Sequence, residues 1–190
     1  MNDPYYKGRI KYKFEGKGYE FEVANTLSST AHVDHGTDNF VRYIKPSIDP
    51  KSILDMGCGY GIIGILLANK FPESKVVMSD KDLLAIRYAK SNMSLNKTEN
   101  IELIPSIGFE AFEDKKFDLI LSNVPAKVGD KAIEEDFLVQ PINHLNPGGE
   151  YWIVIVNALN HIYPKLIRKY DLKMTEIKRR SGHIIYKITK

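Results

Sequence analysis

The sequence contains very little from which a disulfide or a thiolate metal site could be built. One of its 190 residues is a cysteine, Cys58, which excludes an internal disulfide bond and a metal site made of several thiolates. None of the five histidines has partners at metal-ligand spacing, so we expect no bound metal. A single cysteine favours a reducing, cytoplasmic setting.

Long apolar runs, repeats and low-complexity tracts are also absent. No apolar run reaches ~18 residues, so we expect no membrane-spanning helix, and the start "MNDPYYKGRIKYKF" does not resemble a signal peptide. The length predicts one domain over 1–190, monomeric, with a hairpin and loop over 1–36 and a catalytic core over 37–190.

The charge is modest overall but unevenly distributed. The net charge is +3, and residues 161–190 hold nine Lys and Arg against two Asp and Glu, whereas residues 51–160 hold eleven against fifteen. A basic end beside an acidic body favours a surface for a polyanion such as RNA. A solvated pair of strands that carries lysines for solubility explains the same pattern equally well.

Residue periodicity predicts an α/β protein with a hairpin at its start. Residues 10–23 alternate apolar and polar around "EGKG", which indicates a β-hairpin. A helix is expected over 38–46, capped by Thr37 or Asp38. Further strands are expected at 52–57, 75–80, 101–106, 117–123 and 150–156, with helices at 62–71, 81–96 and 131–145 between them.

The last thirty residues depart from this alternation. A helix over 163–170 precedes two strands, 172–180 and 183–190, which Ser181-Gly182 joins tightly enough to make them antiparallel. Five parallel strands plus this hairpin resemble a Rossmann-like class I methyltransferase. We therefore predict a seven-stranded, mostly parallel sheet with an antiparallel last strand, helices on both faces, and the separate N-terminal hairpin.

The stretch "DMGCGYGIIG" fits two glycine motifs at once. Gly59, Gly61 and Gly64 match the G-x-G-x-x-G of dinucleotide sites, with an acidic residue, Asp80, further along the chain. Read from Asp55, the stretch instead gives D-x-G-x-G-x-G, which resembles motif I of methyltransferases. Both motifs need glycine, because the backbone turns sharply against its ligand.

Charge favours the second interpretation. A dinucleotide would place a pyrophosphate at the loop, and Asp55 would repel it. S-adenosylmethionine brings a sulfonium and an ammonium group, which a carboxylate attracts by a few kcal/mol at ~4 Å in a partly dry cleft. We therefore predict S-adenosylmethionine as the cofactor.

The residues expected around this cofactor follow several strands. Asp80 ends a strand where its carboxylate can accept the ribose hydroxyls, and its alternative role is to cap the next helix. Ser106 lies where the third strand would reach the adenine, and Cys58 is expected to act through its backbone N–H. The complete predicted cofactor set is Thr37, Asp55, Gly57, Cys58, Gly59, Gly61, Asp80, Lys81, Ser106 and Asn123.

Four stretches together carry a family resemblance: "DMGCGYGIIGI", "SNVPAKVG", "VDHGT" and "NPGGEYWIVIVNALNHIYPKL". They resemble the small-domain methyltransferase superfamily, and within it the catalytic domain of the 16S ribosomal RNA guanine-N2 methyltransferases and their single-domain archaeal relatives. The resemblance implies a cytoplasmic enzyme that methylates an exocyclic amine with S-adenosylmethionine, on guanine in ribosomal RNA.

Two residues depart from the family pattern. The family motif after the fourth strand is Asn-Pro-Pro followed by an aromatic or apolar residue, whereas this chain has Val124 and Ala126 at the second and fourth positions. A stack on the base at that fourth position is worth ~1–3 kcal/mol. Its loss at Ala126 leaves open a different acceptor, a supplementary tyrosine from the N-terminal hairpin, or reduced activity.

The catalytic residues are expected at the head of this motif: Asn123, Val124 and Pro125. The Asn123 amide oxygen and the Val124 carbonyl can accept the two protons of a planar amine, while Pro125 stiffens the turn, so that catalysis rests on orientation without a strong base. An alternative role for Asn123 is a strand-end turn in which its side chain bonds its own backbone. The predicted RNA-binding residues are Ala126, Lys127, Lys178, Arg179 and Arg180.

Other functions fit parts of the same pattern. A protein glutamine amide or an adenine amine could take the place of guanine, because both are planar and suit Asn-x-Pro. A weakened RNA-binding protein that keeps the fold is compatible with Val124 and Ala126. A dinucleotide oxidoreductase fits only the glycines.

Overall fold

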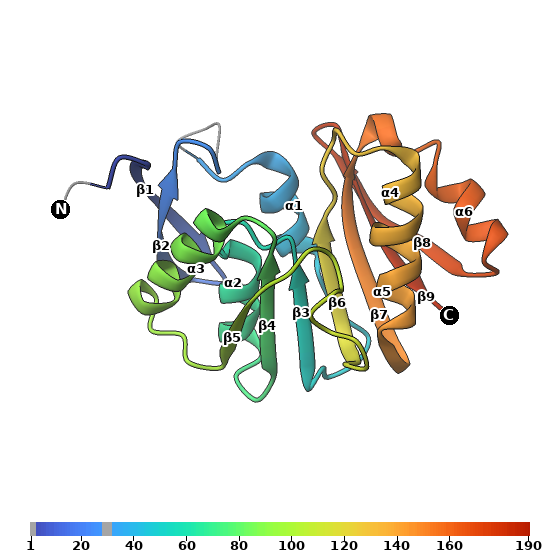
Figure 1. Ribbon diagram of the computed structural model, residues 1–190, viewed down its shortest axis with the longest axis horizontal. Coiled ribbons are helices and arrows are strands. Elements are labelled where there is room, and N and C mark those ends of the chain that lie inside the picture. Colours follow the sequence, from blue (N-terminus) through green and yellow to red (C-terminus); the bar gives the residue numbers. More distant parts are fainter. Residues whose placement is uncertain (1–2, 28–31) are drawn as a thin grey trace.

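The computed structural model describes residues 3–27 and 32–190. Residues 1–2 and 28–31 of the predicted N-terminal segment lie outside the described residues. Strands β1 (Tyr6–Phe14) and β2 (Lys17–Ala24) form the expected antiparallel hairpin, and the remaining strands form one seven-stranded sheet in the order β5-β4-β3-β6-β7-β9-β8 (Figure 1).

The strand directions confirm the predicted sheet. Five neighbouring strands run parallel, β9 pairs with β7 in the antiparallel sense, and β8 pairs antiparallel with β9 at the sheet edge. Their bounds are β3 (Ser52–Met56), β4 (Lys75–Asp80), β5 (Ile101–Pro105), β6 (Phe117–Asn123), β7 (Leu145–Val156), β8 (Lys173–Arg180) and β9 (His183–Thr189). All five parallel strands therefore end at one edge of the sheet, where ligands bind in open α/β folds.

Alternating side chains fill two separate cores. Ile53 and Trp152 point into the core below the hairpin, α1 (His35–Tyr43), α2 (Ile62–Lys70) and α3 (Leu83–Leu95), whereas Leu54 and Tyr151 point into the opposite one. The second core is covered by α4 (Asp130–Glu134), α5 (Gln140–Asn143) and α6 (Tyr163–Lys169), with a 3₁₀ turn over Asn157–Leu159. The predicted helices on both faces are confirmed.

Among the described residues, no helix is long and apolar enough to span a membrane.

Helix α1 starts earlier than predicted. The cap is Asp34, whose Oδ1 accepts the Thr37 N–H at 2.9 Å, and the helix begins at His35. The predicted start at 38 with a Thr37 or Asp38 cap was wrong. Asp and Thr are both good caps, so composition alone could not choose among these neighbouring residues, and Thr37 instead lies in the first turn of the helix.

The helix predicted over 131–145 is divided by a π-helical turn over Glu135–Val139. Pro141 explains the irregularity, because it has no N–H to donate to the Phe137 carbonyl four residues earlier. The Tyr151 hydroxyl donates to that carbonyl at 3.0 Å instead, and the Tyr163 hydroxyl approaches it at 3.4 Å. The freed backbone acceptor is therefore satisfied inside the second core.

Helix α3 binds the hairpin through two asparagines that lie one turn apart. Asn92 is fully buried; its Oδ1 accepts the Glu22 N–H at 2.7 Å and its Nδ2 donates to the Glu22 carbonyl at 2.9 Å. Asn96 makes the same pair of bonds with Glu20, at 3.2 and 2.8 Å. The backbone of β2 is thus hydrogen-bonded to side chains along the edge that faces away from β1.

Candidate functional site

The glycine loop joins the end of β3 to the start of α2. Gly57, Gly59 and Gly61 have φ values of 71°, 56° and 92°, a left-handed conformation that favours glycine. A Cβ on Gly57 or Gly59 would have no atom within 4 Å, whereas a Cβ on Gly61 would lie 3.2 Å from the Ala89 side chain. The first two glycines therefore border open space that a ligand can enter, and the third permits close packing on α3.

The N–H groups of this loop already bond within the protein. The Ser79 carbonyl accepts from Gly57 at 2.8 Å and from Cys58 at 2.9 Å, while carboxylates accept from Gly59 and Gly64. A loop that binds pyrophosphate presents such donors to the phosphates. Because these donors are occupied, the one at Gly59 by the Asp80 carboxylate, the geometry disfavours the dinucleotide interpretation of the glycine motif.

Asp80 is the last residue of β4, the strand beside β3 and the glycine loop. Its Oδ2 accepts the Gly59 N–H and its Oδ1 accepts the Asp82 N–H, both at 2.9 Å. The alternative role as cap of α3 was wrong, because Asp82 accepts the Leu84 N–H and caps that helix. Each carboxylate oxygen of Asp80 keeps a lone pair, so the ribose role stays a prediction that this geometry permits.

Ser106 follows β5 and contributes more to its own loop than expected. Its N–H bonds the Asp80 carbonyl at 3.1 Å, which holds the ends of β4 and β5 together. Its hydroxyl donates to the Gly108 carbonyl and accepts the Ala111 N–H. A contact with adenine would therefore fall to the backbone at this position. Lys81, also predicted at the cofactor, is exposed.

Asp55 lies below the glycine loop and is fully buried. Its Oδ2 accepts the Gly64 N–H at 2.8 Å, while its Oδ1 has no partner among the described residues. Burial raises the pKa of this carboxyl from 3.8 to about 7; the Gly64 bond opposes the rise and the charge of Asp80 adds to it. Asp55 therefore braces the loop and acts on a ligand through its field. Burial also raises the pKa of the Cys58 thiol, which keeps it protonated.

The structure brings Asn123 and Thr37 together across 86 positions of the chain. The Asn123 Nδ2 donates to the Thr37 Oγ1 at 3.1 Å, so the side chain does not bond its own backbone as the turn alternative required. No described residue donates to the Asn123 Oδ1. Thr37 is itself buried at the start of α1, where Asp34 accepts its N–H. The Asn123 amide is thereby held with its oxygen available as an acceptor.

The residues after Asn123 divide into a buried and an exposed part. The Val124 N–H bonds the Val154 carbonyl at 3.0 Å and its side chain lies in the second core. Pro125, Ala126 and Lys127 are all exposed. The main chain at Val124 is therefore fixed to the sheet, whereas nothing at Ala126 offers a ring to an acceptor.

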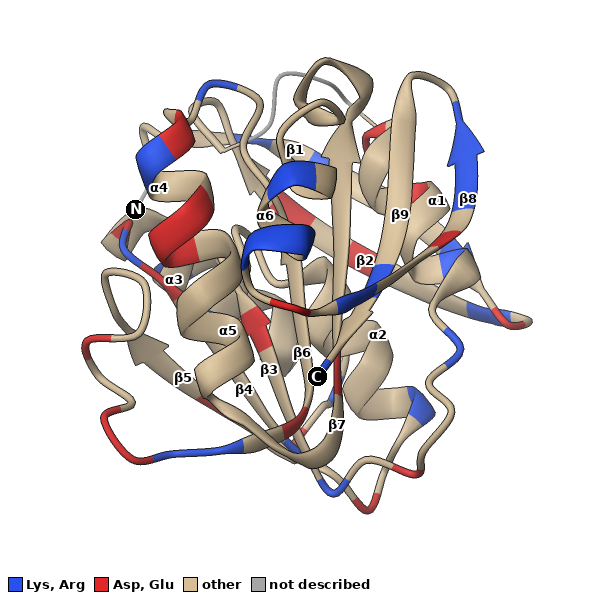
Figure 2. Cartoon of the chain, turned by 90° about the vertical axis from the view of Figure 1, so that its right-hand side faces the viewer, with Lys and Arg blue, Asp and Glu red and all other residues tan. Residues whose placement is uncertain are grey.

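The three basic residues near the end of β8 have different surroundings. The Lys178 ammonium lies 5.3 Å from the centre of the Tyr43 ring, and Arg179 forms an ion pair with Glu176 at 2.8 Å. The Arg180 carbonyl accepts from Asn39 of α1 at 3.4 Å, which places the end of β8 beside the helix that carries Thr37. Figure 2 shows the positions of Lys and Arg along β8 and on α6, and acidic positions on α4.

Two residues that the sequence analysis did not single out organise the site. The Asn92 Nδ2 also donates to the Tyr60 carbonyl at 2.9 Å, so one buried side chain joins the hairpin to the glycine loop. Burial, with the charge of Asp34, raises the pKa of the Tyr60 hydroxyl and keeps it protonated. The sequence signal for Asn92 was a pair of asparagines four residues apart in a predicted helix. The same pair would be equally typical of a solvent-facing helix surface.

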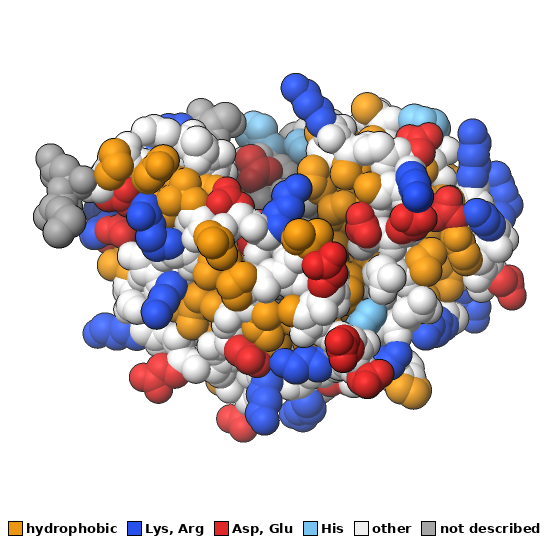
Figure 3. Space-filling model, viewed as in Figure 1, with side chains coloured by type: hydrophobic (Ala, Val, Ile, Leu, Met, Phe, Trp, Pro, Cys, Tyr) orange, Lys and Arg blue, Asp and Glu red, His pale blue; other side chains and the backbone are white. Residues whose placement is uncertain are grey.

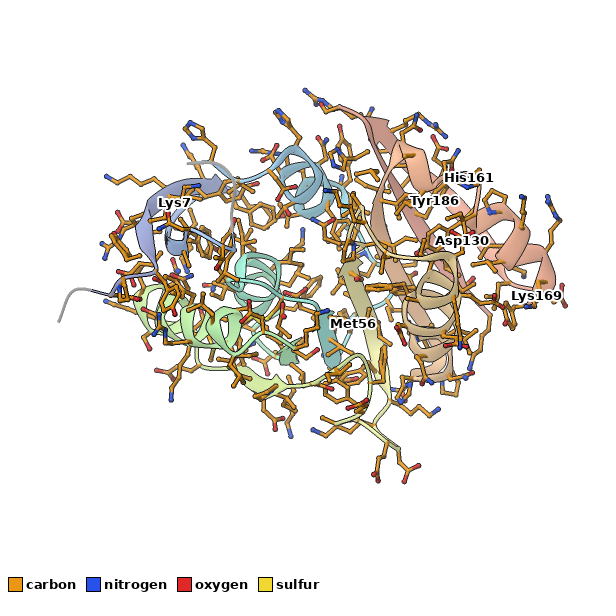
Figure 4. All side chains as sticks on the ribbon, turned by 45° about the horizontal axis from the view of Figure 1, so that its top comes forward. Lys7, Met56, Asp130, His161, Lys169 and Tyr186 are labelled. Atoms are coloured by element: carbon orange, nitrogen blue, oxygen red, sulfur yellow. The ribbon has the colours of Figure 1, made fainter. Side chains whose placement is uncertain are left out.

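These groups surround a recess at the carboxyl edge of the sheet. Figure 3 shows the surface hollowed at the top of the molecule, with an acidic side chain at the floor, and Figure 4 shows Met56, the last residue of β3, between the hairpin and the α4 side. Open space over Gly57 and Gly59, with carboxylates at Asp55 and Asp80, fits a ligand that is cationic at one end. S-adenosylmethionine is such a ligand.

Comparisons with known proteins agree with this architecture. The family model of the methyltransferase small domain matches residues 18–187. A ribosomal RNA small subunit methyltransferase C from Haemophilus influenzae is 37% identical over 75% of this chain and 42% of its own length. An uncharacterized Bacillus subtilis protein, YbxB, is 28% identical over 94% of this chain and 90% of its own length. The chain thus spans less than half the length of the methyltransferase C relatives that it matches.

Solved structures share the fold. A T. thermophilus 16S rRNA N2 methyltransferase, RsmC, in complex with AdoMet and guanosine, superposes with a TM-score of 0.82 over 99% of this chain and 51% of its own, at 21% identity. A ribosomal protein L11 methylase from Lactobacillus delbrueckii gives 0.70 over 83% of this chain and 80% of its own, at 24% identity. At such identities the likeness shows the fold, and it confirms the predicted Rossmann-like class.

Proposed function

The chain belongs to the methyltransferase small domain family, as its resemblance predicted, and from this membership we propose that it is an S-adenosylmethionine-dependent N-methyltransferase. We further propose as its acceptor the exocyclic N2 amine of a guanine in ribosomal RNA. The name of the methyltransferase C relatives and the guanosine bound to the T. thermophilus structure support this choice.

The observation that carries the proposal is the tethered Asn123. Its Nδ2 is held by Thr37, so the amide cannot turn over without breaking that bond. The Oδ1, to which no described residue donates, would accept one proton of the substrate amine. The Val124 carbonyl follows on a main chain whose N–H is fixed to Val154. Two acceptors on a rigid support are what a planar amine with two protons requires.

Reaction at this site depends on orientation more than on proton transfer. The lone pair of an aromatic amine is delocalised into its ring, and two accepted hydrogen bonds favour the pyramidal nitrogen that attacks. Fixed oxygens also stabilise the positive charge that develops on that nitrogen, at no cost of reorganisation during the reaction. The base enters unpaired, since an amine inside a duplex is out of reach.

The chain's own residues would hold the cofactor at the carboxyl edge of the sheet. Asp80 would accept the ribose hydroxyls, the backbone of Gly57 and Gly59 would allow close approach, and the buried Asp55 would favour the cationic end. When bound, S-adenosylmethionine supplies a methyl group activated by its sulfonium. The predicted cofactor contacts of Cys58, Lys81 and Ser106 are supported only by the positions of these residues in the glycine loop and after the strand ends.

RNA would meet the basic residues at the end of β8. Arg180 lies next to α1 and therefore near Asn123, while Lys178 is exposed above Tyr43. These residues would position phosphates, with Lys127 on the exposed loop after Pro125. Arg179 contributes less free charge because Glu176 already pairs with it.

Methylation of unmodified ribosomal RNA tests the proposal directly. Purified protein is incubated with radiolabelled S-adenosylmethionine and small-subunit RNA stripped of modification, and the labelled nucleotide is identified after digestion. We expect label on the N2 of a guanine. Asn123→Ala should abolish transfer yet keep the thermal shift that S-adenosylmethionine produces. Asn146→Ala, a matched change at the opposite sheet edge where Asn146 bonds Asp118, should keep both.

Two outcomes would overturn parts of this proposal. Stabilisation by NAD and not by S-adenosylmethionine would refute the cofactor and the activity together. Label in a protein, or on an adenine amine, would refute guanine while leaving the chemistry intact.

A protein glutamine amide is the second candidate, because it presents the same planar pair of protons. The observation that favours it is Ala126, which is exposed and provides no ring on which a base could stack. Ribosomal proteins supplied beside the RNA in the same assay distinguish the two acceptors.

A further inference from the structure

A second cavity lies away from the glycine loop, between the start of the chain and α3. It has a volume of about 920 Å³, and its lining includes Asp3, Tyr6, Glu22, Arg87 and Tyr88. Figure 3 shows hydrophobic side chains gathered at this end of the molecule, beside the grey N-terminal residues, with basic side chains nearby. None of these residues takes part in the site described above.

Aromatic and guanidinium planes dominate this surface. Tyr5 and Tyr6 are 48% and 46% exposed, unusually open for large rings. The Arg87 guanidinium lies 5.7 Å from the centre of the Tyr5 ring and 5.4 Å from that of Tyr88. Asp3 holds the group in place, because it accepts from the Tyr88 hydroxyl at 2.7 Å, from Arg87 at 2.8 Å and from the Tyr5 N–H at 3.0 Å. Planar surfaces fixed in this way suit stacking of a flat ligand.

The charges at the cavity are already balanced. The two carboxylates, Asp3 and Glu22, are paired with Arg87 at 2.8 Å and Arg9 at 2.9 Å, and the Ser91 hydroxyl donates to Glu22 at 2.9 Å. Because these charges are paired, the cavity has no net charge that would attract a metal ion or a free phosphate. It offers carboxylate and hydroxyl oxygens to the polar edge of a neutral ring.

The cavity is connected to the cofactor loop through one residue. The side chain of Glu22 lines the cavity, and its backbone N–H and carbonyl are both bound by Asn92, which also binds the Tyr60 carbonyl in the glycine loop. One buried side chain, that of Asn92, therefore joins the edge of the cavity to the glycine loop. Lys90, three residues after Arg87 on the same helix face, is exposed beside it.

We infer that Tyr5, Tyr6 and Arg87 form a second nucleic-acid contact, which stacks an unpaired base of the RNA strand that carries the methyl acceptor. The inference rests on the proposed RNA substrate and goes beyond it by assigning a base-binding surface to the hairpin side. This surface holds a flanking nucleotide by its ring, while the basic residues of β8 hold the backbone by its charge.

Binding of a short, fluorescently labelled single-stranded RNA of mixed sequence tests the assignment by anisotropy over a series of salt concentrations. The Tyr5→Ala/Tyr6→Ala double variant should weaken binding about 5- to 150-fold, the range of one base–aromatic stack. Its salt slope should equal that of the wild type, because stacking releases no counterions. Tyr6→Phe keeps the ring and should bind normally.

Tyr170→Ala is the matched control, because Tyr170 is 38% exposed on the opposite side of the molecule beside Glu134. It should bind RNA as the wild type does. All variants are first shown to keep the thermal shift with S-adenosylmethionine. Thiouridine-substituted RNA should crosslink to the peptide that contains Tyr5 and Tyr6.

The outcomes separate this inference from the proposed function. Equal RNA affinity in the Tyr5/Tyr6 double variant and in Tyr170→Ala, or crosslinks confined to β8 and β9, would overturn the inference even if guanine is methylated. RNA bound through the tyrosines but never methylated would refute the proposed activity and support the surface. A wild-type protein that does not bind RNA would overturn both.

Discussion

Replacing Asp55 by asparagine should change how the stability of the protein depends on pH. The carboxyl is fully buried, with Oδ2 bonded to the Gly64 N–H and Oδ1 unpartnered. Its pKa is raised to about 7, chiefly by burial, so the folded state holds a proton that the unfolded chain releases near pH 3.8. The neutral carboxyl therefore contributes to the stability of the folded state. This contribution is fully present below the unfolded-state pKa and is lost as the pH rises through about 7.

The magnitude follows from the shift itself. A rise of about three pKa units costs roughly 4 kcal/mol once the group is ionised in the folded state. Between pH 5 and pH 7 the wild type should lose about 2 kcal/mol, because the folded-state carboxyl is itself half ionised at the upper pH. Asn cannot ionise but keeps an acceptor for Gly64, so its own contribution should not change over this range. The difference in free energy of unfolding, variant minus wild type, should therefore grow by about 2 kcal/mol.

Urea unfolding at pH 5, 6, 7 and 8 measures this difference. Asp118→Asn is the control: burial raises the pKa of Asp118, but hydrogen bonds from Asn146, Lys51 and Ser52 outweigh it and lower the pKa overall. Asp118 is thus ionised in both states above pH 5, and its difference from the wild type should stay constant. A constant difference for Asp55→Asn as well would refute the reasoning.

Three further changes test other contacts. Asn92→Ala should lower the free energy of unfolding by about 3 kcal/mol in urea titrations, because three backbone partners lose a buried hydrogen bond, and should weaken S-adenosylmethionine binding in calorimetry. Thr37→Val should reduce kcat of methyl transfer about tenfold, since it releases the Asn123 amide. Lys178→Ala with Arg180→Ala should weaken RNA binding and lower its salt slope by about 1, measured by anisotropy.

Each of these three predictions has a matched control variant. Asn96→Ala removes the two bonds to Glu20 and one to the Asn92 carbonyl, but none to the glycine loop. It should therefore destabilise the hairpin and leave the cofactor loop intact. Equal cofactor loss in both asparagine variants would dismiss the role of Asn92. Thr37→Ser should restore kcat. Lys75→Ala, at the start of β4 on the opposite sheet edge, should keep the salt slope, and an equal decrease there would argue against a local phosphate contact.

The sheet could be predicted because its strands are nearly continuous apolar runs bounded by small or polar residues. Segments such as "FDLILSN" admit few other structures, and Ser181-Gly182 is too short a link for anything but a hairpin. Two boundaries were missed for local reasons. Neighbouring cap residues compete at the start of α1, and the π turn before Pro141 depends on a tyrosine from β7 that fills the vacant hydrogen bond.

The site could be predicted only as far as local motifs reach. The glycine loop and Asp80 are visible in the sequence because their geometry needs glycines and a strand-end carboxylate. The Thr37–Asn123 bond joins segments 86 residues apart, and no local pattern specifies it. Asn92 was missed for a related reason. An asparagine in a helix is expected to face solvent, and only the structure shows that β2 lies against it.

The two asparagines of α3 also cover one edge of the hairpin, the edge of β2 that faces away from β1. Four helical residues rise about 6 Å and two strand residues about 6.8 Å, so Asn92 and Asn96 match the spacing of Glu22 and Glu20 and stand in for a missing strand. An uncovered strand edge recruits other edges and begins aggregation. By occupying that edge with side chains, α3 removes it as a template for pairing with a further strand.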